Sequence, residues 1–357
     1  MTGPLHVGLY TSSLAQSHAK PPGVDVFVDR LGEQLARRGH FVVMFTYSPP
    51  AAQRSYELRH LTPSTTATSR LRRTFIAPIR LNWLDTSALD VMHLHGDDWF
   101  WLRRQLPTVR TFHGSALYEA RHAHRARRRV GQYVTYGLEL AASRLATQSY
   151  GVTPDNGPGY LTAGHLPLAY EAPPDRQSPR AERPTVLFVG TWNGRKRGRM
   201  LQQCFEDAVL PRIPDAQLVM VSDYCEPGPN VTWARRPSDD ELAELYRSAW
   251  LFCLPSVYEG FGAPYLEAMA HGTPVLASSN PGSRFVLAKG RYGALAGDAD
   301  LGERIAALLA DAPTRTRMAE CGRVRAAEFG WERLLDLHEQ AYCEAIASFR
   351  GARRLAG

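Results

Sequence analysis

The sequence predicts an α/β protein. Short apolar runs that suit buried strands alternate along the chain with longer segments whose apolar residues recur at helical spacing. Loops rich in Gly, Pro and small polar residues follow the strands, an order typical of parallel sheets covered by helices. The length of 357 residues favours about two domains. The best linker is Glu171–Pro184, because this stretch is rich in proline and charge and lacks periodicity.

The composition indicates a folded cytosolic protein. Hydrophobic residues make up 44% of the chain, and no apolar run approaches the roughly 20 residues that span a bilayer. The N-terminal residues lead straight into a strand pattern, so we expect no signal peptide. The five cysteines are scattered and form no C-x-x-C pair, which suits a reducing compartment. The net charge of +7 suits phosphorylated ligands or anionic surfaces, but without a nucleic-acid motif we expect no nucleic-acid partner.

The first elements predict a βαβ unit. Leu5–Ser12 and Phe41–Tyr47 are apolar runs that suit buried strands. Between them, Val24–His40 has apolar residues at helical spacing and ends in Arg-Arg-Gly, a common helix terminus. The unit lacks a G-x-G-x-x-G fingerprint, which disfavours a nicotinamide oxidoreductase.

Three histidines lie at the ends of the next two predicted strands. His93 and His95 would share one face of the strand Leu89–Gly96. This spacing suits a metal pair, but no third ligand follows at an obvious spacing, so we favour a packed or hydrogen-bonded pair. The strand Thr108–Ser115 then ends at His113.

A basic helical segment follows at Tyr118–Arg144, with a potential break near Gly131. It carries a dense cationic cluster made of Arg121, Arg125, Arg127, Arg128, Arg129, His122 and His124. A solvated helix face is the simpler interpretation, and attraction to anionic lipid or an acidic acceptor is the alternative. Two further strands are expected within Leu145–Thr153 and Gly164–Tyr170.

The second half opens with a strand and a basic loop. The apolar run Thr185–Gly190 leads into TWNGRKRG, whose Arg195, Lys196 and Arg197 precede a helix. Cationic side chains beside a helix N-terminus suit a diphosphate. Farther on, Ser238 and Glu241 have the spacing of a capping box.

Two carboxylates flank a glycine-rich turn in Tyr258–Met269, which reads YEGFGAPYLEAM. We place Glu259 on a loop and Glu267 in the first turns of a helix that begins near Pro264. The backbone N–H groups of Gly260, Phe261, Gly262 and Ala263 would then point out of the helix N-terminus, where a phosphate binds readily. Apolar runs at Trp250–Ser256 and His271–Ser279 predict buried strands on either side.

The stretch Asn230–Ser278 resembles the E-x7-E region of retaining GT-B glycosyltransferases, the family 4 or group 1 enzymes. The resemblance covers PS-x-x-EGFG before the helix and EAMA-x-GTPV within and after it. It implies two Rossmann-like domains facing across a cleft. Residues 1–170 would form the acceptor domain, 171–184 the linker and 185–330 the nucleotide-sugar domain. Residues 331–357 would form a helix that crosses back to the first domain.

The resemblance also implies roles for individual residues. Lys196 and Arg195 would grip the leaving diphosphate together with the amides of Gly260, Phe261 and Gly262. Glu267 would accept hydrogen bonds from the ribose, and Glu259 from the donor sugar. His113 would lie close to the donor sugar and acceptor, and Gly23 close to the acceptor. The chain departs from the family pattern at Thr191, which replaces an arginine, and at the glycine pair, of which only Gly23 remains.

The implied function is transfer of a sugar from a UDP- or GDP-sugar to an acceptor hydroxyl with retention of configuration, without metal or cofactor. The acceptor would be a small molecule, a natural-product intermediate or an envelope glycan or lipid. The location would be cytoplasmic, with peripheral membrane contact through Tyr118–Arg144 as an option. Two alternatives stay open: an epimerase or phosphorylase on the same fold, and a non-catalytic sugar-nucleotide-binding protein at a membrane surface.

Overall fold

The computed structural model describes residues 3–14, 23–48, 54–61, 75, 77–123, 125–171 and 179–356. Two compact units are present, each built on its own sheet. The first contains Met1–Leu117, Gly131–Ala169 and Trp331–Gly357, and the second contains Tyr118–Val130 and Tyr170–Gly330. The sequence assigns 118–130 to the first domain instead. Of the predicted features, His124 and linker residues 172–178 lie outside the described residues.

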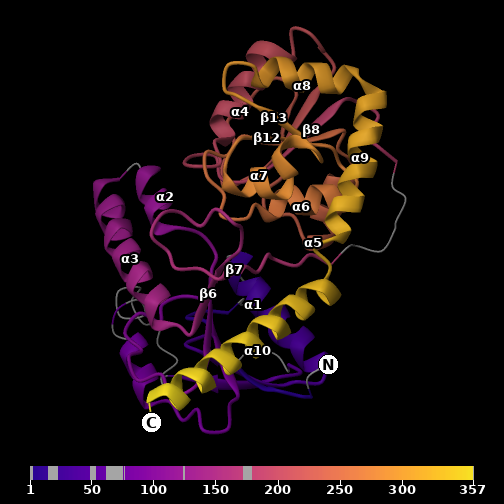
Figure 1. Cartoon of the computed structure of the whole chain (residues 1–357). Helices are drawn as coiled ribbons and strands as arrows, with labels where there is room; N and C mark the ends of the chain where they lie inside the picture. The colour runs from indigo at the N-terminus through magenta and orange to yellow at the C-terminus, as the bar shows by residue number, and fades with distance from the viewer. Residues whose placement is uncertain are drawn as a thin grey trace. The chain divides into compact units, whose positions relative to one another are not determined.

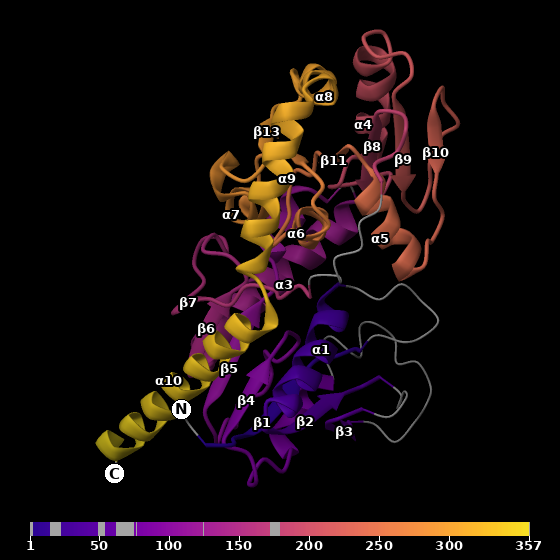
Figure 2. The same cartoon turned by 90° about the vertical axis from the view of Figure 1, so that its right-hand side faces the viewer.

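The sheet of the first unit has seven parallel strands in the order β3-β2-β1-β4-β5-β6-β7 (Figure 2). Its strands are β1 His6–Tyr10, β2 Phe41–Thr46, β3 Glu57–His60, β4 Val91–Leu94, β5 Thr108–Phe112, β6 Gln148–Gly151 and β7 Gly164–His165. The strands predicted in this half are confirmed, although each is shorter than its apolar run. The largest difference is at Gly164–Tyr170, where only the first two residues pair with β6.

The two faces of this sheet bury different clusters because successive side chains point to opposite faces. Val7 and Leu9 of β1 pack with α1, Gly23–Arg37, and with α10, Trp331–Ala356. Tyr10 packs on the other face with Met92. The helix α10, yellow in Figure 1, contacts β4, β5 and α1, so the last helix completes the core of the first unit.

The basic segment is helical but breaks earlier than predicted. The structure has α2 at Ala116–Arg121 and α3 at Ala126–Leu145, so α2 ends well before Gly131, which lies inside α3. A glycine in a helix interior costs only about 1 kcal/mol relative to alanine, which the helix tolerates here. The carbonyl of Gly131 even accepts a hydrogen bond from Thr135 Oγ1 at 3.0 Å.

A buried ion cluster fixes the loop after β4. Asp98 is fully buried and accepts a hydrogen bond from Arg104 Nη2 at 2.7 Å. The same carboxylate pairs with Arg110 of β5, whose guanidinium lies 4.5 Å from the ring centroid of Phe112. Burial lowers the pKa of each arginine to about 10. The cluster joins the ends of β4 and β5, where His95 and His113 follow.

The sheet of the second unit has six parallel strands in the order β10-β9-β8-β11-β12-β13. These are β8 Thr185–Val189, β9 Gln217–Val221, β10 Val231–Trp233, β11 Leu251–Leu254, β12 Val275–Ser278 and β13 Ala294–Ala296. The helices are α4 Gly198–Cys204, α5 Asp239–Ser248, α6 Ala263–Ala270, α7 Pro281–Val286, α8 Leu301–Ala310 and α9 Ala312–Ala327, with shorter turns η3 Phe205–Val209 and η4 Ala288–Gly290. The remaining short helix, η2 Ala77–Trp83, belongs to the first unit.

The predicted capping box is confirmed at the start of α5. Ser238 Oγ accepts a hydrogen bond from the Glu241 backbone N–H at 3.2 Å, and Glu241 Oε2 accepts one from the Ser238 N–H at 2.7 Å. Because all strands of this sheet are parallel, the loops that follow β8 and β11 meet at the same edge.

None of the helices in the described parts of the chain has both the length and the apolar character needed to cross a bilayer. The five cysteines are free thiols, and Cys225 and Cys253 are buried.

Candidate functional site

Two loops at the carboxyl edge of the second sheet are joined by hydrogen bonds. The loop after β8 carries Arg195, and the loop after β11 runs from Pro255 to Gly262. The carbonyl of Arg195 accepts hydrogen bonds from the Val257 N–H at 2.9 Å and from Ser256 Oγ at 3.1 Å. In return, Arg195 Nη1 donates to the carbonyl of Tyr258 at 2.6 Å. The basic loop and the acidic loop therefore form one structural element.

Two cations of this element face one buried carboxylate. Arg195 Nη1 lies 2.6 Å from Glu259 Oε1, and Lys196 Nζ lies 3.8 Å from the same oxygen. Glu259 is only 5% exposed. Burial raises the pKa of this carboxyl, but the positive charges of Lys196 and Arg195 outweigh burial and hold the pKa below its ordinary value. Glu259 is therefore a charged carboxylate at neutral pH.

The start of α6 presents unpaired backbone donors. Within the described residues, the N–H groups of Gly260, Phe261, Gly262 and Ala263 have no backbone hydrogen-bond partner. Gly262 caps the helix with φ of 90°, and a Cβ there would lie 2.4 Å from the ring of Tyr265. Only glycine therefore fits this turn. Free N–H groups and the positive end of the helix dipole make this turn suitable for an anion.

Arg197 connects the loops around the site through hydrogen bonds and an ion pair. It caps α4 in the left-handed region with φ of 58°. Its guanidinium donates to the carbonyl of Pro255 at 2.6 Å and to Ser278 Oγ at 3.0 Å, and it pairs with Asp298 at 2.7 Å. The sequence places Arg197 among the cations that suit a diphosphate, and in the structure these bonds hold the loops after β8, β11 and β12 together.

The N-terminus of α7 supports the acidic loop from behind. The Gly282 N–H donates to the carbonyl of Glu259 at 3.0 Å, and a Cβ at Gly282 would lie 2.4 Å from the carbonyl oxygen of Phe261. The Phe261 side chain is 3% exposed and packs against Phe285 and Phe329. Phe261 is therefore a core side chain, and only its backbone N–H faces the anion-binding turn.

A tyrosine orients the second glutamate. Glu267 lies on α6, and Tyr246 Oη of α5 donates to Glu267 Oε2 at 2.8 Å. The Tyr246 ring is buried and stacks on His271 with centroids 5.5 Å apart. Sequence reasoning missed Tyr246, whose spacing in α5 reads as an ordinary core residue.

The first unit holds a separate cluster of histidines. His113 Nε2 lies 3.0 Å from His95 Nδ1, so one of these nitrogens carries the shared proton. His93 bonds Thr111 Oγ1 at 2.8 Å and Tyr342 Oη of α10 at 2.9 Å. Burial lowers the pKa of His93 and His95 well below the ordinary value, and that of His113 to about 3. The imidazoles are therefore neutral at physiological pH.

These contacts distinguish the two interpretations of the His93 and His95 pair. Both rings are buried and lie 4.0 Å apart, and each bonds protein side chains. In the described residues, no group of three or more His, Cys, Asp or Glu side chains is placed to hold a metal ion. The packed, hydrogen-bonded pair is therefore the one observed.

Comparison with known proteins identifies the family. The family model described as Glycosyltransferase Family 4 matches residues 22–153, and the one described as Glycosyl transferases group 1 matches residues 172–325. The chain belongs to glycosyltransferase family 4.

This family 4 chain is similar to several curated proteins. It is 33% identical to a D-inositol 3-phosphate glycosyltransferase of Gordonia bronchialis over 193 residues, which is 53% of this chain but 39% of that protein. A protein of the same description from Nocardia farcinica is 26% identical, with 97% of this chain and 90% of that protein covered. With an MMP α-(1→4)-mannosyltransferase of Mycolicibacterium hassiacum, the match spans only 28% of the relative's length.

Solved structures show that this family 4 chain has the GT-B fold. Sucrose-phosphate synthase from Thermosynechococcus elongatus superposes with a TM-score of 0.77 at 22% identity, covering 96% of this chain and all of that one. HepE from Anabaena, determined with UDP-glucose, superposes with a TM-score of 0.68 at 14% identity, covering 96% of this chain and all of that one.

The predicted site residues of this family 4 chain fall into two groups. Arg195, Lys196, Glu259 and the Gly260–Gly262 turn come together in the second unit, with Glu267 on the helix that follows. His113 lies in the first unit. Gly23, also in the first unit, is the exposed first residue of α1, and no atom lies within 4 Å of its Cβ position.

Proposed function

We propose that this protein transfers a sugar from a UDP- or GDP-sugar to an acceptor hydroxyl. Membership of glycosyltransferase family 4 supports sugar transfer, and the UDP-glucose complex of HepE supports a nucleotide-sugar donor on this fold. The observation that carries the proposal is the second-unit site. There, two cations and a turn of unpaired N–H groups lie on joined loops, which suits a diphosphate.

The site can stabilise the charge of a departing diphosphate. Lys196 Nζ is 3.8 Å from Glu259, beyond hydrogen-bond distance, so it can turn to a phosphate without losing a strong bond. Arg195 is held more tightly, at 2.6 Å from the same oxygen, and keeps the carboxylate partly neutralised. Preorganised donors of this kind typically contribute about 2.7–4 kcal/mol each to transition-state stabilisation.

In this proposal the two glutamates bind different parts of the donor. Glu267, oriented by Tyr246, accepts hydrogen bonds from the ribose hydroxyls. Glu259 accepts hydrogen bonds from the sugar, because it is a charged carboxylate beside the anion-binding turn. Each would discriminate against an analogue that lacks the hydroxyl, since that hydrogen bond would then be lost.

We further propose retention of configuration without a metal. Arg195, Lys196 and the α6 N–H groups supply the positive charge that a leaving diphosphate requires. Front-face attack, in which the leaving phosphate accepts the proton of the acceptor hydroxyl, needs no protein nucleophile. His113 then serves as a hydrogen-bonding group towards the donor sugar, and its contact with His95 Nδ1 at 3.0 Å leaves the other ring nitrogen, Nδ1, for that bond.

The acceptor in this proposal is a small molecule, a natural-product intermediate or an envelope glycan or lipid. Curated relatives are described as D-inositol 3-phosphate glycosyltransferases and as α-maltose-1-phosphate synthase, which favours a small phosphorylated polyol or sugar as the first acceptor to test.

Product analysis tests the proposed reaction against its alternatives. The protein is incubated with UDP- or GDP-sugars, with and without acceptor, and products are resolved by NMR. We expect release of nucleoside diphosphate together with a glycoside of unchanged anomeric configuration. An epimerised sugar nucleotide without acceptor, or a sugar phosphate formed from inorganic phosphate, would instead establish one of the same-fold alternatives. Binding without any turnover would favour the non-catalytic protein.

A membrane-surface contact is a second proposal, carried by α3. Residues 125–129 of this helix region are exposed, including four arginines. Beside them, Val130, Tyr133 and Val134 are 63%, 46% and 50% exposed and have the spacing of one helix face. Exposed apolar residues next to a polybasic segment suit an anionic bilayer.

Liposome sedimentation tests this contact. The protein should sediment with phosphatidylserine vesicles and less with neutral ones. Replacing Arg125, Arg127 and Arg128 with Gln should abolish the difference. Equal sedimentation of the native protein and the triple variant would refute the contact.

A further inference from the structure

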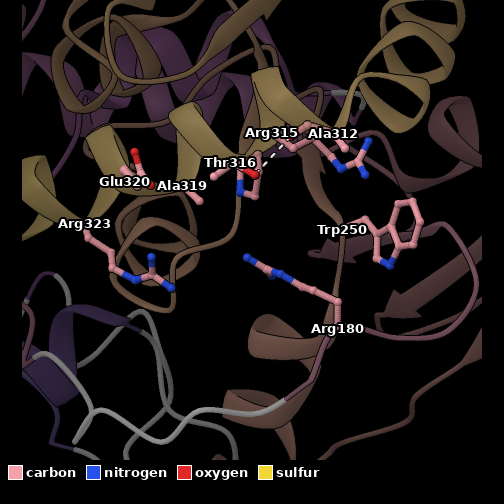
Figure 3. Close-up of a pocket in the computed structure, with 9 residues that line it drawn as sticks. Arg180, Trp250, Ala312, Arg315, Thr316, Ala319, Glu320 and Arg323 are labelled. Atoms are coloured by element: carbon pink, nitrogen blue, oxygen red, sulfur yellow. Dashed lines mark hydrogen bonds between the residues drawn. The ribbon is translucent and has the colours of Figure 1, made fainter.

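A cluster of arginines lines a pocket of about 300 Å³ in the second unit, shown in Figure 3. Its walls include Arg180, Arg315 and Arg323 together with Trp250 and Glu320. The volume lies at the low end of the range for small-molecule sites, roughly 300–1,000 Å³. The pocket is therefore large enough for a small organic molecule.

The pocket lies at the opposite edge of the sheet from the donor-site loops. Trp250 and Pro274 line it, and they immediately precede β11 and β12, so the pocket is at the amino edge. The donor-site loops follow β8 and β11 at the carboxyl edge. A strand of four residues separates the two edges by roughly 13 Å at about 3.3 Å per residue. The pocket is a different site from the proposed donor site.

Two of the three arginines have structural roles that fix their positions. Arg180 Nη1 donates to the carbonyls of Arg247 at 2.8 Å and Ala249 at 2.6 Å. Arg315 Nη1 donates to the carbonyl of Leu308 at 2.7 Å, and its guanidinium lies 4.4 Å from the ring centroid of Trp250. Both guanidiniums are therefore preorganised, and their remaining donors need little ordering to bind a ligand.

Arg323 has no structural role of the kind that Arg180 and Arg315 have. In the parts of the chain that the structure describes, its guanidinium has no hydrogen-bond or ion-pair partner. It lies against Gly272, where a Cβ would come within 2.1 Å of Arg323 Nη2. Figure 3 shows the guanidinium of Arg323 directed towards Arg180, while the carboxylate of Glu320 points away from both.

The positive charge of the three pocket arginines is not neutralised by ion pairs with carboxylates of the described residues. Among the described residues, no carboxylate lies within ion-pair distance of Arg180, Arg315 or Arg323. Burial lowers the pKa of Arg180, and the positive charges of Arg323 and Arg315 lower it further. Asp311 is the nearest acidic influence on Arg315, and it caps α9 by accepting the Thr314 N–H at 2.9 Å. The guanidiniums of Arg180 and Arg323 point towards one another, and Arg315 adds positive charge at the Trp250 end of the pocket, so the pocket favours an anionic occupant.

We propose that this pocket binds a small phosphorylated molecule through Arg323 and Arg180, with Arg315 lying at the Trp250 end of the pocket. The phosphate would contact the guanidiniums, and the organic part would occupy the remaining volume beside Trp250. The proposal is independent of the sugar-transfer reaction, because no pocket residue belongs to the donor site. Inorganic phosphate and a phosphomonoester share the required chemistry, so both serve as probes.

Calorimetric titration to millimolar concentrations of inorganic phosphate and glycerol 3-phosphate, at constant ionic strength with chloride, tests the site. The proteins are the native chain, Arg323→Gln, the control Arg317→Gln on the same helix, and Lys196→Ala. We expect binding in the native chain, Arg317→Gln and Lys196→Ala, and at least tenfold weaker binding in Arg323→Gln. Tighter binding of glycerol 3-phosphate would identify an organic phosphate as the ligand class, and equal binding would identify free phosphate.

Other outcomes overturn the proposal. Absence of binding in the native chain would do so, as would native-like binding in Arg323→Gln. Loss of binding in Lys196→Ala alone would assign the phosphate to the donor site instead. Because Arg323 is exposed and has no described bonding partner, its replacement should leave the fold intact. Unchanged thermal unfolding of Arg323→Gln without ligand checks this point.

Discussion

Arg195 Nη1 lies 2.6 Å from Glu259 Oε1, which joins the loop after β8 to the loop after β11. Each residue comes from a different strand of the second sheet, and the contact is possible because both strands end at the same edge. The buried carboxylate keeps its charge because the cations oppose the cost of burial. The same cations are available to a diphosphate that approaches the N-terminus of α6.

Replacing Lys196 tests the role of the basic loop. We expect Lys196→Ala to lower kcat by roughly 10²–10³, the usual effect of removing one transition-state donor. The fold should survive, because the only described ion pair of Lys196 is the 3.8 Å contact with Glu259. The matched control is Arg199→Ala, whose side chain is exposed on α4. Steady-state kinetics with both substrates saturating gives the comparison, and equal kcat values for the two variants would contradict the assigned role.

Gly262→Ala tests the shape of the anion-binding turn. Its φ of 90° disfavours any side chain, and the new Cβ would lie 2.4 Å from the Tyr265 ring. We expect a loss of about 1–3 kcal/mol in unfolding free energy, measured by urea denaturation, and weaker nucleotide binding. Gly351→Ala is the control, since nothing lies within 4 Å of that position. If Gly262→Ala kept native stability and native nucleotide affinity, the turn would not have the described geometry.

Much of the fold follows from the sequence. The strands at β1, β2, β4, β5, β8, β11 and β12 were predicted from their apolar runs, and the α5 cap from Ser238 and Glu241. These features are local, so their signal lies within a few residues. The break before α3 was misplaced, because a glycine marks a weak helix position and the sequence between Arg121 and Ala126 contains neither Gly nor Pro.

The candidate site was only partly predictable, because many of its contacts join residues that are far apart in the sequence. Glu259, Lys196 and the glycine turn belong to one recognisable local pattern, but their supports come from distant segments. Tyr246 and Gly282 contact the site from α5 and α7, and Asn280 Nδ2 donates to the Ser256 carbonyl at 2.9 Å. Nothing in the local sequence of these residues indicates such contacts. The contacts of Arg197 with Pro255 and Ser278 could not be predicted either, because they depend on its left-handed backbone conformation.

Tyr246→Phe tests the orientation of Glu267. The variant loses the 2.8 Å hydrogen bond to Glu267 Oε2 while its ring can still stack on His271. We expect a loss of about 0.5–1.5 kcal/mol in unfolding free energy. The KM for the donor should rise more than kcat falls, because a contact with the ribose stabilises the bound substrate and the transition state equally. Calorimetry and kinetics measure the two effects, and a fall in kcat with unchanged KM would argue against a ribose-binding Glu267.

The histidine cluster predicts loss of stability in mild acid. His338 of α10 belongs to this cluster, since its ring centroid lies 5.5 Å from that of His93. Burial lowers the pKa of His338 to about 4, below the ordinary value of about 6.5, although a hydrogen bond to the Leu334 carbonyl opposes this shift. Between these two values the unfolded chain binds more protons than the folded one, so the unfolding free energy falls as the pH drops from about 6.5 towards 4. Burial lowers the pKa of His113 in the same direction, to about 3.

Thermal unfolding followed across this pH range measures the effect. In His338→Gln, which cannot titrate, the melting temperature should depend less on pH than in the native chain. The control is His60→Gln, outside the cluster and exposed at the end of β3. The same slope in native protein and His338→Gln would mean that His338 is not the titrating group.

The central claim is that a nucleoside diphosphate binds in the second unit between the basic loop and the start of α6. The most direct measurement is a crystal structure of the protein with UDP or GDP. We predict diphosphate oxygens within hydrogen-bond distance of Lys196 Nζ and of N–H groups in the Gly260–Ala263 turn, with the ribose hydroxyls at Glu267. A nucleotide bound away from this turn, with Lys196 and Glu267 making no contact to it, would contradict the account.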